Sequence, residues 1–361
     1  MTAGIERARG MGVRTGALAL LACFVAMAIP ITARAQGVPR YAVDRSWPKT
    51  FPDRWVLGGI GGLCVDAHDH LFILHRQDAP DGDLNAGHLA PPVIEVDAAG
   101  NLINSWGDPK LLDQRLHSCA FDKAGNIWIG SAPSGMVQKY THDGKLLLQV
   151  GKKGTYDTAD GTEKGAPLNS NAAVFTHPSS VYIDPANGDV YVSDGEQPRG
   201  NRRIVVMDYT GKFLRQWTPD AKSIHCMTVA NDGLFYICDR PGSRILVYDK
   251  MGKAIKSFDV PWTPYTPPAD GKAKESGGVV VSLDLSRDAK QSLMYLVNQN
   301  NDQVEILDRQ TGRILSSFGD GAGHFAGQFD LPHGIAVDSK GNVYVAENRG
   351  RRVQKFAIVG R

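Results

Sequence analysis

The decisive stretch of this sequence is FDLPHGIAVD at residues 329–338, which leads into the turn Gly341-Asn342 and the short runs 343–345 and 352–356. Apolar and polar residues alternate in these runs with a period of two, and a turn that contains glycine separates them. This pattern is typical of antiparallel hairpins. Similar phrases begin near residues 62, 117, 178, 225 and 279.

Six such copies predict an all-β fold, a six-bladed β-propeller, and the copies resemble NHL repeats. Repeats of about 40 to 50 residues, each a sheet too small to bury both faces alone, indicate propeller blades. The last copy has three strands, which leaves an open edge, and residues 39–44 are expected to close the ring as the fourth strand. Inserts at residues 78–92, 151–174 and 263–276 are expected to form loops above one face.

The first 35 residues have the pattern of a secretory signal peptide. Arginines precede an apolar run at residues 17–31, and Ala33-Arg34-Ala35 resembles a cleavage site. The run is shorter than the roughly 20 residues that span a membrane. We therefore expect residues 36–361 to form the propeller, without a membrane span, and to be periplasmic or secreted. Lipid attachment at Cys23 is the alternative, although the apolar run continues past that residue.

The charge balance argues against a nucleic-acid partner. Residues 1–35 hold four of the 40 basic residues and one of the 38 acidic ones, so 36 basic and 37 acidic residues remain after them. A chain that is nearly neutral does not indicate a surface for nucleic acid. We expect a monomer.

Four cysteines follow the leader, namely Cys64, Cys119, Cys226 and Cys238. Export permits disulfides. Cys226 and Cys238 are equidistant from Asp232 in a predicted turn, so they could face each other across one hairpin. The alternative is that all four are buried free thiols.

Three histidines, His117, His225 and His333, stand at the start of predicted innermost strands and are 108 residues apart in each case. They belong to the second, fourth and sixth copies, so sixfold pseudosymmetry would place them about 120° apart around the axis. Three nitrogen ligands with an open fourth position are expected of a catalytic zinc ion. The alternative is that each histidine binds loop backbone. By contrast, His68 and His70 lie in the first hairpin turn and are expected to be solvated.

Several short motifs are shared with a known family. They are Leu74-His75-Arg76, Leu116-His117, residues 192–195 with 203–205, Asp239-Arg240 with Arg244-Ile245, and Leu331-Pro332-His333. These residues resemble peptidyl-α-hydroxyglycine α-amidating lyase, a six-bladed NHL propeller, over nearly all of the chain after residue 35. The resemblance implies that His117, His225 and His333 hold zinc and that Arg76 and Arg240 line the substrate pocket.

The resemblance also implies a reaction, the cleavage of a carbinolamide C–N bond with release of a peptide amide and glyoxylate. Zinc would acidify the substrate hydroxyl. An arginine would hold the carboxylate of a small substrate or peptide as a two-pronged ion pair. The alternative for Arg76 and Arg240 is a structural role, in which they tie loops to backbone carbonyls.

The sequence departs from the family at two positions. The catalytic tyrosine of the family follows the Ser-Asp-Gly phrase, and Glu196 stands there in this chain, before the extra residues 197–200. Glutamate has an ordinary pKa of about 4.3 against about 10 for tyrosine, so it is a far weaker base unless burial raises its pKa. Gly334 stands where the family has an aspartate that helps to bind a structural calcium ion, so a calcium site is not indicated.

The leading hypothesis is a zinc-dependent, lyase-like enzyme that cleaves the C–N bond of an α-hydroxyglycine type of substrate. Arg76 and Glu196 would be its catalytic residues, with Glu196 as an altered base. The alternative is an exported NHL propeller that binds a protein or a cell-envelope polymer and holds a structural metal, because the fold alone does not decide function. A third hypothesis, a calcium-dependent lactonase-like propeller, requires carboxylates on the axis, where this sequence offers histidines.

Overall fold

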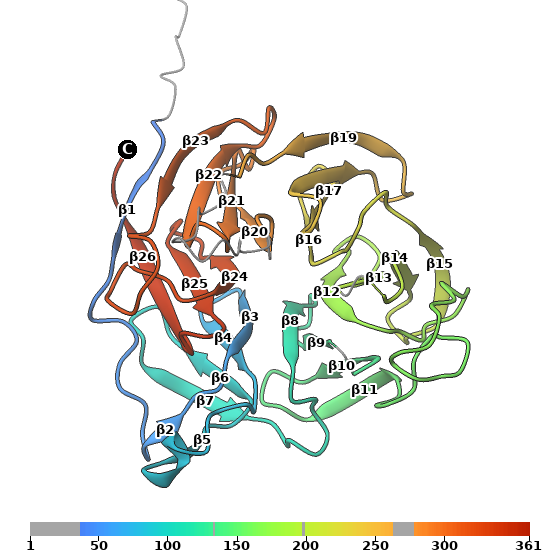
Figure 1. Cartoon of the computed structure of the whole chain (residues 1–361), viewed down its shortest axis with the longest axis horizontal. Helices are drawn as coiled ribbons and strands as arrows, with labels where there is room; N and C mark the ends of the chain where they lie inside the picture. The colour runs from blue at the N-terminus through green and yellow to red at the C-terminus, as the bar shows by residue number, and fades with distance from the viewer. Residues whose placement is uncertain (1–36, 133, 197–198, 263–277) are drawn as a thin grey trace, which may run out of the picture. The chain divides into compact units, whose positions relative to one another are not determined.

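Six four-stranded antiparallel sheets surround a central axis in the computed structural model, which describes residues 37–132, 134–196, 199–262 and 278–361 (Figure 1). We number the sheets as blades 1 to 6 along the chain. Blade 1 comprises β3 (Ile60–Val65), β4 (Leu71–His75), β6 (Val93–Val96) and β7 (Leu102–Trp106). Blade 2 comprises β8 (Leu116–Phe121), β9 (Ile127–Ser131), β10 (Met136–Tyr140) and β11 (Leu146–Gly151). Blade 3 comprises β12 (Pro178–Ile183), β13 (Val190–Asp194), β14 (Arg203–Met207) and β15 (Phe213–Trp217).

The second half of the chain repeats this arrangement. Blade 4 comprises β16 (Cys226–Val229), β17 (Phe235–Asp239), β18 (Arg244–Tyr248) and β19 (Ala254–Asp259). Blade 5 comprises β20 (Ser282–Leu285), β21 (Leu293–Asn298), β22 (Gln303–Asp308) and β23 (Ile314–Phe318). Blade 6 comprises β24 (Pro332–Val337), β25 (Val343–Glu347), β26 (Arg352–Gly360) and β1 (Arg40–Val43). The six-bladed all-β fold that the repeats predict is therefore confirmed.

The ring closes where the two ends of the propeller meet. β1 pairs antiparallel with β26, with Tyr41 opposite Ile358 and Val43 opposite Phe356 (Figure 1). The hydroxyl of Tyr41 also donates to the carbonyl oxygen of Gly341 at 3.0 Å. The N-terminal strand thus covers the edge of β26, as the sequence predicts, and becomes the outermost strand of blade 6.

Aspartates and glycines shape the hairpins between the first and second strands. In blade 2, one carboxylate oxygen of Asp122 accepts the backbone N–H groups of Ala124 and Asn126, and Gly125 adopts a positive φ of 77°. Asp338 does the same in blade 6 with Gly341 at φ 84°. Glycine suits these turns because a positive φ costs it no steric clash.

The hydrophobic core lies between neighbouring blades. For example, Phe72 and Leu74 of β4 pack with Ile127 and Ile129 of β9, and all four side chains are almost completely buried. Further clusters of this kind join the other blades. Each sheet therefore buries its second face against its neighbour, which is what the alternating pattern requires.

Two of the three predicted inserts can be followed. Residues 78–92 contain a short 3₁₀ turn, η1 (Asp83–Asn85), and β5 (His88–Leu89), which pairs in parallel with β2 (Trp55–Val56). The insert at 151–174 is anchored by the fully buried Arg203, which pairs with Asp157 and Asp194. Both inserts join strands at the end of the blades where the inner strands begin. The insert at 263–276 and the predicted leader, 1–35, lie outside the described residues. No helix within the described ranges has the length and apolar character needed to cross a membrane.

Two disulfides are present, and they resolve the alternatives for the four cysteines. Cys226 and Cys238 face each other across the β16–β17 hairpin and are bonded. Cys64 of blade 1 is bonded to Cys119 of blade 2, a pairing that joins two inner strands and that the sequence did not predict. Two disulfides indicate an oxidising compartment outside the cytoplasm.

Removal of β1 tests the closure of the ring. A chain without residues 38–43 loses the partly buried side chains of Val38, Tyr41 and Val43 and exposes β26. We expect its free energy of unfolding to fall by about 3 kcal/mol or more and the protein to self-associate, measured by urea unfolding and size-exclusion chromatography. Tyr41→Phe, which loses only the hydroxyl contacts, should cost about 1 kcal/mol. Equal stability of the truncated and intact chains would contradict this account.

The two disulfides should differ in their contribution to stability. They are separated by 55 residues for Cys64–Cys119 and 12 residues for Cys226–Cys238. A longer loop restricts the unfolded chain more, so Cys64→Ala with Cys119→Ala should cost about 4 kcal/mol and Cys226→Ala with Cys238→Ala about 3 kcal/mol. Urea unfolding of both double variants measures the two values. The reverse order would show that loop entropy does not govern this difference.

Candidate metal centre

The histidine trio, His117, His225 and His333, lies where inner strands begin. The pairing of β8 with β9 shifts register between Leu116 and Ser118, and His117 is the residue left over. The pairing of β24 with β25 shifts in the same way around His333. His225 immediately precedes β16. A register shift re-aims the side chains of His117 and His333, and all three imidazoles meet at one place on the axis.

The trio is nearly equilateral. The ring centroids are 5.0 Å apart for His117 and His225, 4.9 Å for His117 and His333, and 5.1 Å for His225 and His333. One ring nitrogen from each residue lies within 4.8 Å of the other two. The predicted convergence is therefore present, and three nitrogens at this spacing could hold one metal ion.

Each histidine is oriented by the blade that follows it. Nδ1 of His117 donates to the carbonyl oxygen of Ser179 at 2.8 Å, and Nδ1 of His225 donates to Val281 at 2.7 Å. Nδ1 of His333 donates to Gly61 at 3.0 Å. A carbonyl oxygen can only accept, so each Nδ1 carries the proton and each Nε2 keeps its lone pair. Backbone binding, offered by the sequence as the alternative to a metal, is thus the support that orients the three ligand atoms.

Burial keeps these imidazoles neutral. It lowers the pKa of His117, and it lowers the pKa values of His225 and His333 well below the ordinary value, with Arg240 contributing further at His225. Nε2 of His117 and Nε2 of His225 are buried and have no hydrogen-bond partner among the described residues. Unpartnered buried nitrogens are uncommon in proteins. Their free lone pairs fit a metal ion.

Glu196 lies beside the trio. It follows β13 and is 7% exposed, and the hydroxyl of Ser223 donates to its backbone oxygen. Its Oε1 atom is 3.7 Å from Nε2 of His117 and 4.0 Å from Nε2 of His225. The residue at the position of the missing tyrosine therefore enters the site.

Two arginines, Arg76 and Arg240, lie close enough to the trio to act on the pKa values of its histidines. Arg76 follows β4, is 6% exposed, and has an Nε atom without a hydrogen-bond partner among the described residues. Arg240 follows β17 and donates to the side-chain oxygen of Gln299 at 2.7 Å, while its own Nε is likewise unpartnered. Burial lowers the pKa of both, and Glu196 partly offsets this effect. All three residues come from the end of the blades where the inner strands begin, so the structure gathers Arg76, Arg240 and Glu196 around the trio.

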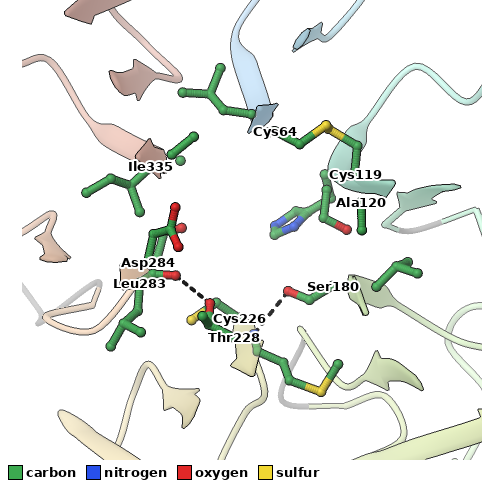
Figure 2. A pocket seen from close by; sticks show the side chains of 18 of the residues that line it. Cys64, Cys119, Ala120, Ser180, Cys226, Thr228, Leu283, Asp284 and Ile335 are labelled. Carbon is green, nitrogen blue, oxygen red and sulfur yellow. Dashed lines mark hydrogen bonds between the residues drawn. A yellow bond between two sulfur atoms is a disulfide. The ribbon is translucent and has the colours of Figure 1, made fainter. Parts of the chain in front are cut away.

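A cavity of about 450 Å³ extends along the axis from the trio toward the far ends of the inner strands. Figure 2 shows the Cys64–Cys119 disulfide on its wall, with Ser180 and Thr228 nearby. Asp284 is the single carboxylate among the residues that line it, and it accepts from Arg287 and from the backbone of Val337. Gly334 also lines this cavity. Among the described lining residues Asp284 is thus one carboxylate, whereas a calcium ion takes about six to eight oxygen ligands.

The other histidines of the first blade serve different purposes. His75 is completely buried, and its imidazole contacts backbone oxygens of Arg76 and Ala90. The side chain of His68 is 79% exposed, as expected for a turn. The prediction for His70 is wrong, because this side chain is only 27% exposed and its Nδ1 lies 2.7 Å from Oε1 of Glu95. Glu95 comes from a later strand, so no pattern around His70 predicts this contact.

Comparison with known proteins adds relatives at low identity. Residues 329–356 match the NHL repeat family. The chain is 25% identical over 353 residues to "Peptidyl-glycine alpha-amidating monooxygenase B" of Xenopus laevis, covering 87% of this chain and 35% of that protein. It is 26% identical over 334 residues to "NHL repeat-containing protein 3" of Mus musculus, covering 88% and 84%. It is 23% identical over 359 residues to "Peptidyl-alpha-hydroxyglycine alpha-amidating lyase 1" of Drosophila melanogaster, covering 88% and 59%.

Among solved structures, the one titled "Streptogramin B lyase structure" matches with a TM-score of 0.55 and 13% identity, over 88% of this chain and 98% of that one. At this identity the likeness concerns the fold alone. The chain spans about a third of the monooxygenase that it matches. The chain is therefore a six-bladed NHL-repeat propeller that is distantly related both to the peptide-amidating proteins and to NHL repeat-containing protein 3.

Proposed function

We propose that this protein is a zinc-dependent lyase that cleaves the C–N bond of an α-hydroxyglycine type of substrate. One observation carries the proposal: three imidazoles converge on one point of the axis, the Nε2 atoms of His117 and His225 have no hydrogen-bond partner among the described residues, and Glu196, Arg76 and Arg240 lie near that point. A carboxylate and two cations beside a metal site are the groups that this reaction needs. The similarity to an amidating lyase supports the same assignment.

Zinc fits the donor set. Zinc sites that keep an open position commonly use three neutral imidazoles. In each of the three histidines the Nδ1–H group donates to a backbone oxygen, which leaves Nε2 to bind the ion. When bound, a zinc ion would supply Lewis-acid chemistry at that position. His117, His225 and His333 would be its ligands.

The residues around the trio have separate tasks in this proposal. Arg76 and Arg240 bind the substrate carboxylate, because a guanidinium pairs with a carboxylate through two parallel hydrogen bonds. Glu196 accepts the proton of the substrate hydroxyl. As that proton moves to Glu196, a C=O bond forms, the C–N bond breaks, and the leaving amide nitrogen takes up the proton from Glu196, which restores its carboxylate. The products are an amide and glyoxylate.

Glu196 makes this centre different from one with a tyrosine. A carboxylate is intrinsically a weaker base than the phenolate of a tyrosine. Its position 3.7 Å from Nε2 of His117 suits proton transfer next to the metal. We propose that a metal ion held by His117, His225 and His333 would acidify the substrate hydroxyl and would so compensate for the weaker base.

A second candidate function is binding without catalysis. The chain is similar to NHL repeat-containing protein 3 over 84% of that protein, whose name states no reaction. In this case the propeller would be an exported scaffold for a protein or a polymer, and the trio would hold a structural metal. For either function we propose that residues 1–35 are a signal peptide.

Metal content tests the trio directly. His225→Ala removes one of three ligands, so we expect it to lose about one equivalent of bound zinc per chain relative to the wild type, measured by elemental analysis of the purified proteins. His88→Ala is the matched control, because His88 is exposed on the β5 segment and should leave the zinc content unchanged. Equal zinc in the wild type and His225→Ala would remove the basis of the proposal.

Turnover tests the reaction. The wild type should release glyoxylate from N-benzoyl-α-hydroxyglycine, and Glu196→Gln should lower kcat by about 100-fold or more because it removes the proton acceptor. Arg76→Gln should raise KM by about 10- to 100-fold, since it removes a charge-assisted contact to the substrate carboxylate. Arg313→Gln, at an exposed position, is the control.

Failure of turnover separates the two candidate functions. If the wild type holds zinc in the trio and leaves this compound intact, the lyase assignment is wrong and the scaffold remains. Retained catalysis in Glu196→Gln would instead show that another group takes the proton.

A further inference from the structure

A second group of metal-ligating side chains lies at the other end of blade 1, away from the trio. Asp66 directly follows β3, whereas the trio sits where inner strands begin. We propose that Asp66, Glu95 and His142, with His70 beside them, form a second site for a zinc ion, which we call the interblade site. It is independent of the proposed function.

The geometry of the interblade site is compact. Asp66, Glu95 and His142 each offer one ligand atom, and these atoms lie within 4.8 Å of one another. Nε2 of His142 is 3.3 Å from Oδ2 of Asp66 and 3.7 Å from Oε1 of Glu95. Nδ1 of His70 is 2.7 Å from the same Oε1 atom. Three donor groups therefore lie within the reach of one ion, and His70 lies beside one of them, Glu95.

Glu95 in blade 1 and Lys139 in blade 2 occupy matching positions, and the difference between them is what distinguishes the interblade site. Glu95 is opposite Phe72 in the pairing of β4 with β6, and Lys139 is opposite Trp128 in the matching pairing of β9 with β10. Lys139 forms an ion pair of 2.8 Å with Asp122, the turn aspartate of that blade. Blade 1 keeps its turn aspartate, Asp66, but places the carboxylate of Glu95 where blade 2 has an ammonium group.

Among the described residues, this exchange leaves the carboxylates of Asp66 and Glu95 without a lysine or arginine as ion-pair partner. The side chains of Asp66 and Glu95 are only 5% and 1% exposed, and the ion pairs formed by these two residues all involve histidines. Buried charges need compensation by a counter-charge or a metal ion. A divalent cation would neutralise both carboxylates at once.

The ligand atoms are already oriented. Oδ1 of Asp66 accepts the backbone N–H groups of His68 and His70, which fixes the carboxylate and leaves Oδ2 toward His142. The ring of His142 packs edge-on against Phe72, with centroids 5.0 Å apart. Supported ligands of this kind lose little freedom when an ion binds.

The mixture of ligands selects the class of metal. Calcium and magnesium prefer oxygen atoms, whereas an imidazole together with two carboxylates suits a borderline transition metal such as zinc. His142 is 42% exposed, so an ion can enter from solvent. His142 belongs to blade 2 and the carboxylates to blade 1, so zinc would cross-link the same two blades that Cys64–Cys119 joins on the cavity wall.

The test uses the full chain with the trio disabled by His117→Ala and His225→Ala, so that zinc bound there cannot be counted. In this parent, stripped of metal, titration with zinc chloride should show about one bound zinc ion and a rise in Tm. His142→Phe keeps an aromatic ring against Phe72 but removes the ligand nitrogen. Added to this parent, it should weaken zinc binding by about 100-fold or more and abolish the rise in Tm. Loss of a partner that only supports a ligand already costs about 10- to 100-fold in metal affinity. Adding His88→Ala is the matched control and should change neither result.

A second variant protects the test against simple misfolding. Glu95→Lys in the same parent recreates the ion pair of blade 2, so the protein should fold without metal at a Tm no lower than the parent and bind no zinc there. The proposal is overturned if the parent binds no zinc, or if binding persists unchanged in Glu95→Lys or in His142→Phe. Cobalt(II) provides a second readout, with visible absorption expected in the parent and absent in both variants. Failure of the lyase assay would not affect any of these outcomes.

Discussion

The packing of six inner strands around one axis is the constraint on which the rest of the structure depends. Each sheet is twisted and has two faces to bury, one against the preceding blade and one against the next, so all six sheets are covered only when the chain closes into a ring. The pairing of β1 with β26 completes that ring. Once it is closed, the starts of the inner strands have no freedom to separate, and side chains placed there must meet.

The fold could be predicted because its signal is local and repeated. A turn aspartate, a glycine and two alternating runs specify one hairpin, and six copies specify the ring. The trio was predictable for the same reason, because His117, His225 and His333 stand at equivalent places in alternate copies. Glu196 could be singled out only through the resemblance, because no periodicity marks its position.

Contacts between side chains of neighbouring blades were not predictable. The Cys64–Cys119 bond and the approach of His142 to Asp66 and Glu95 join residues of neighbouring blades whose contact no motif within a single copy predicts. Such contacts depend on how far one sheet is rotated and shifted against the next, and the alternating pattern of a single blade does not contain that information. A comparison of the copies does reveal one signal, since Glu95 takes the place that Lys139 has in the next blade.

The hydrogen bonds of the trio divide the blades into two classes. Blades 2, 4 and 6 supply imidazoles, and blades 3, 5 and 1 supply the backbone oxygens of Ser179, Val281 and Gly61 that hold them. This alternation requires an even number of blades. A ring with five or seven would put two donors or two acceptors side by side, so evolution could extend the loops of this scaffold freely but could not gain or lose a single blade without dismantling its centre.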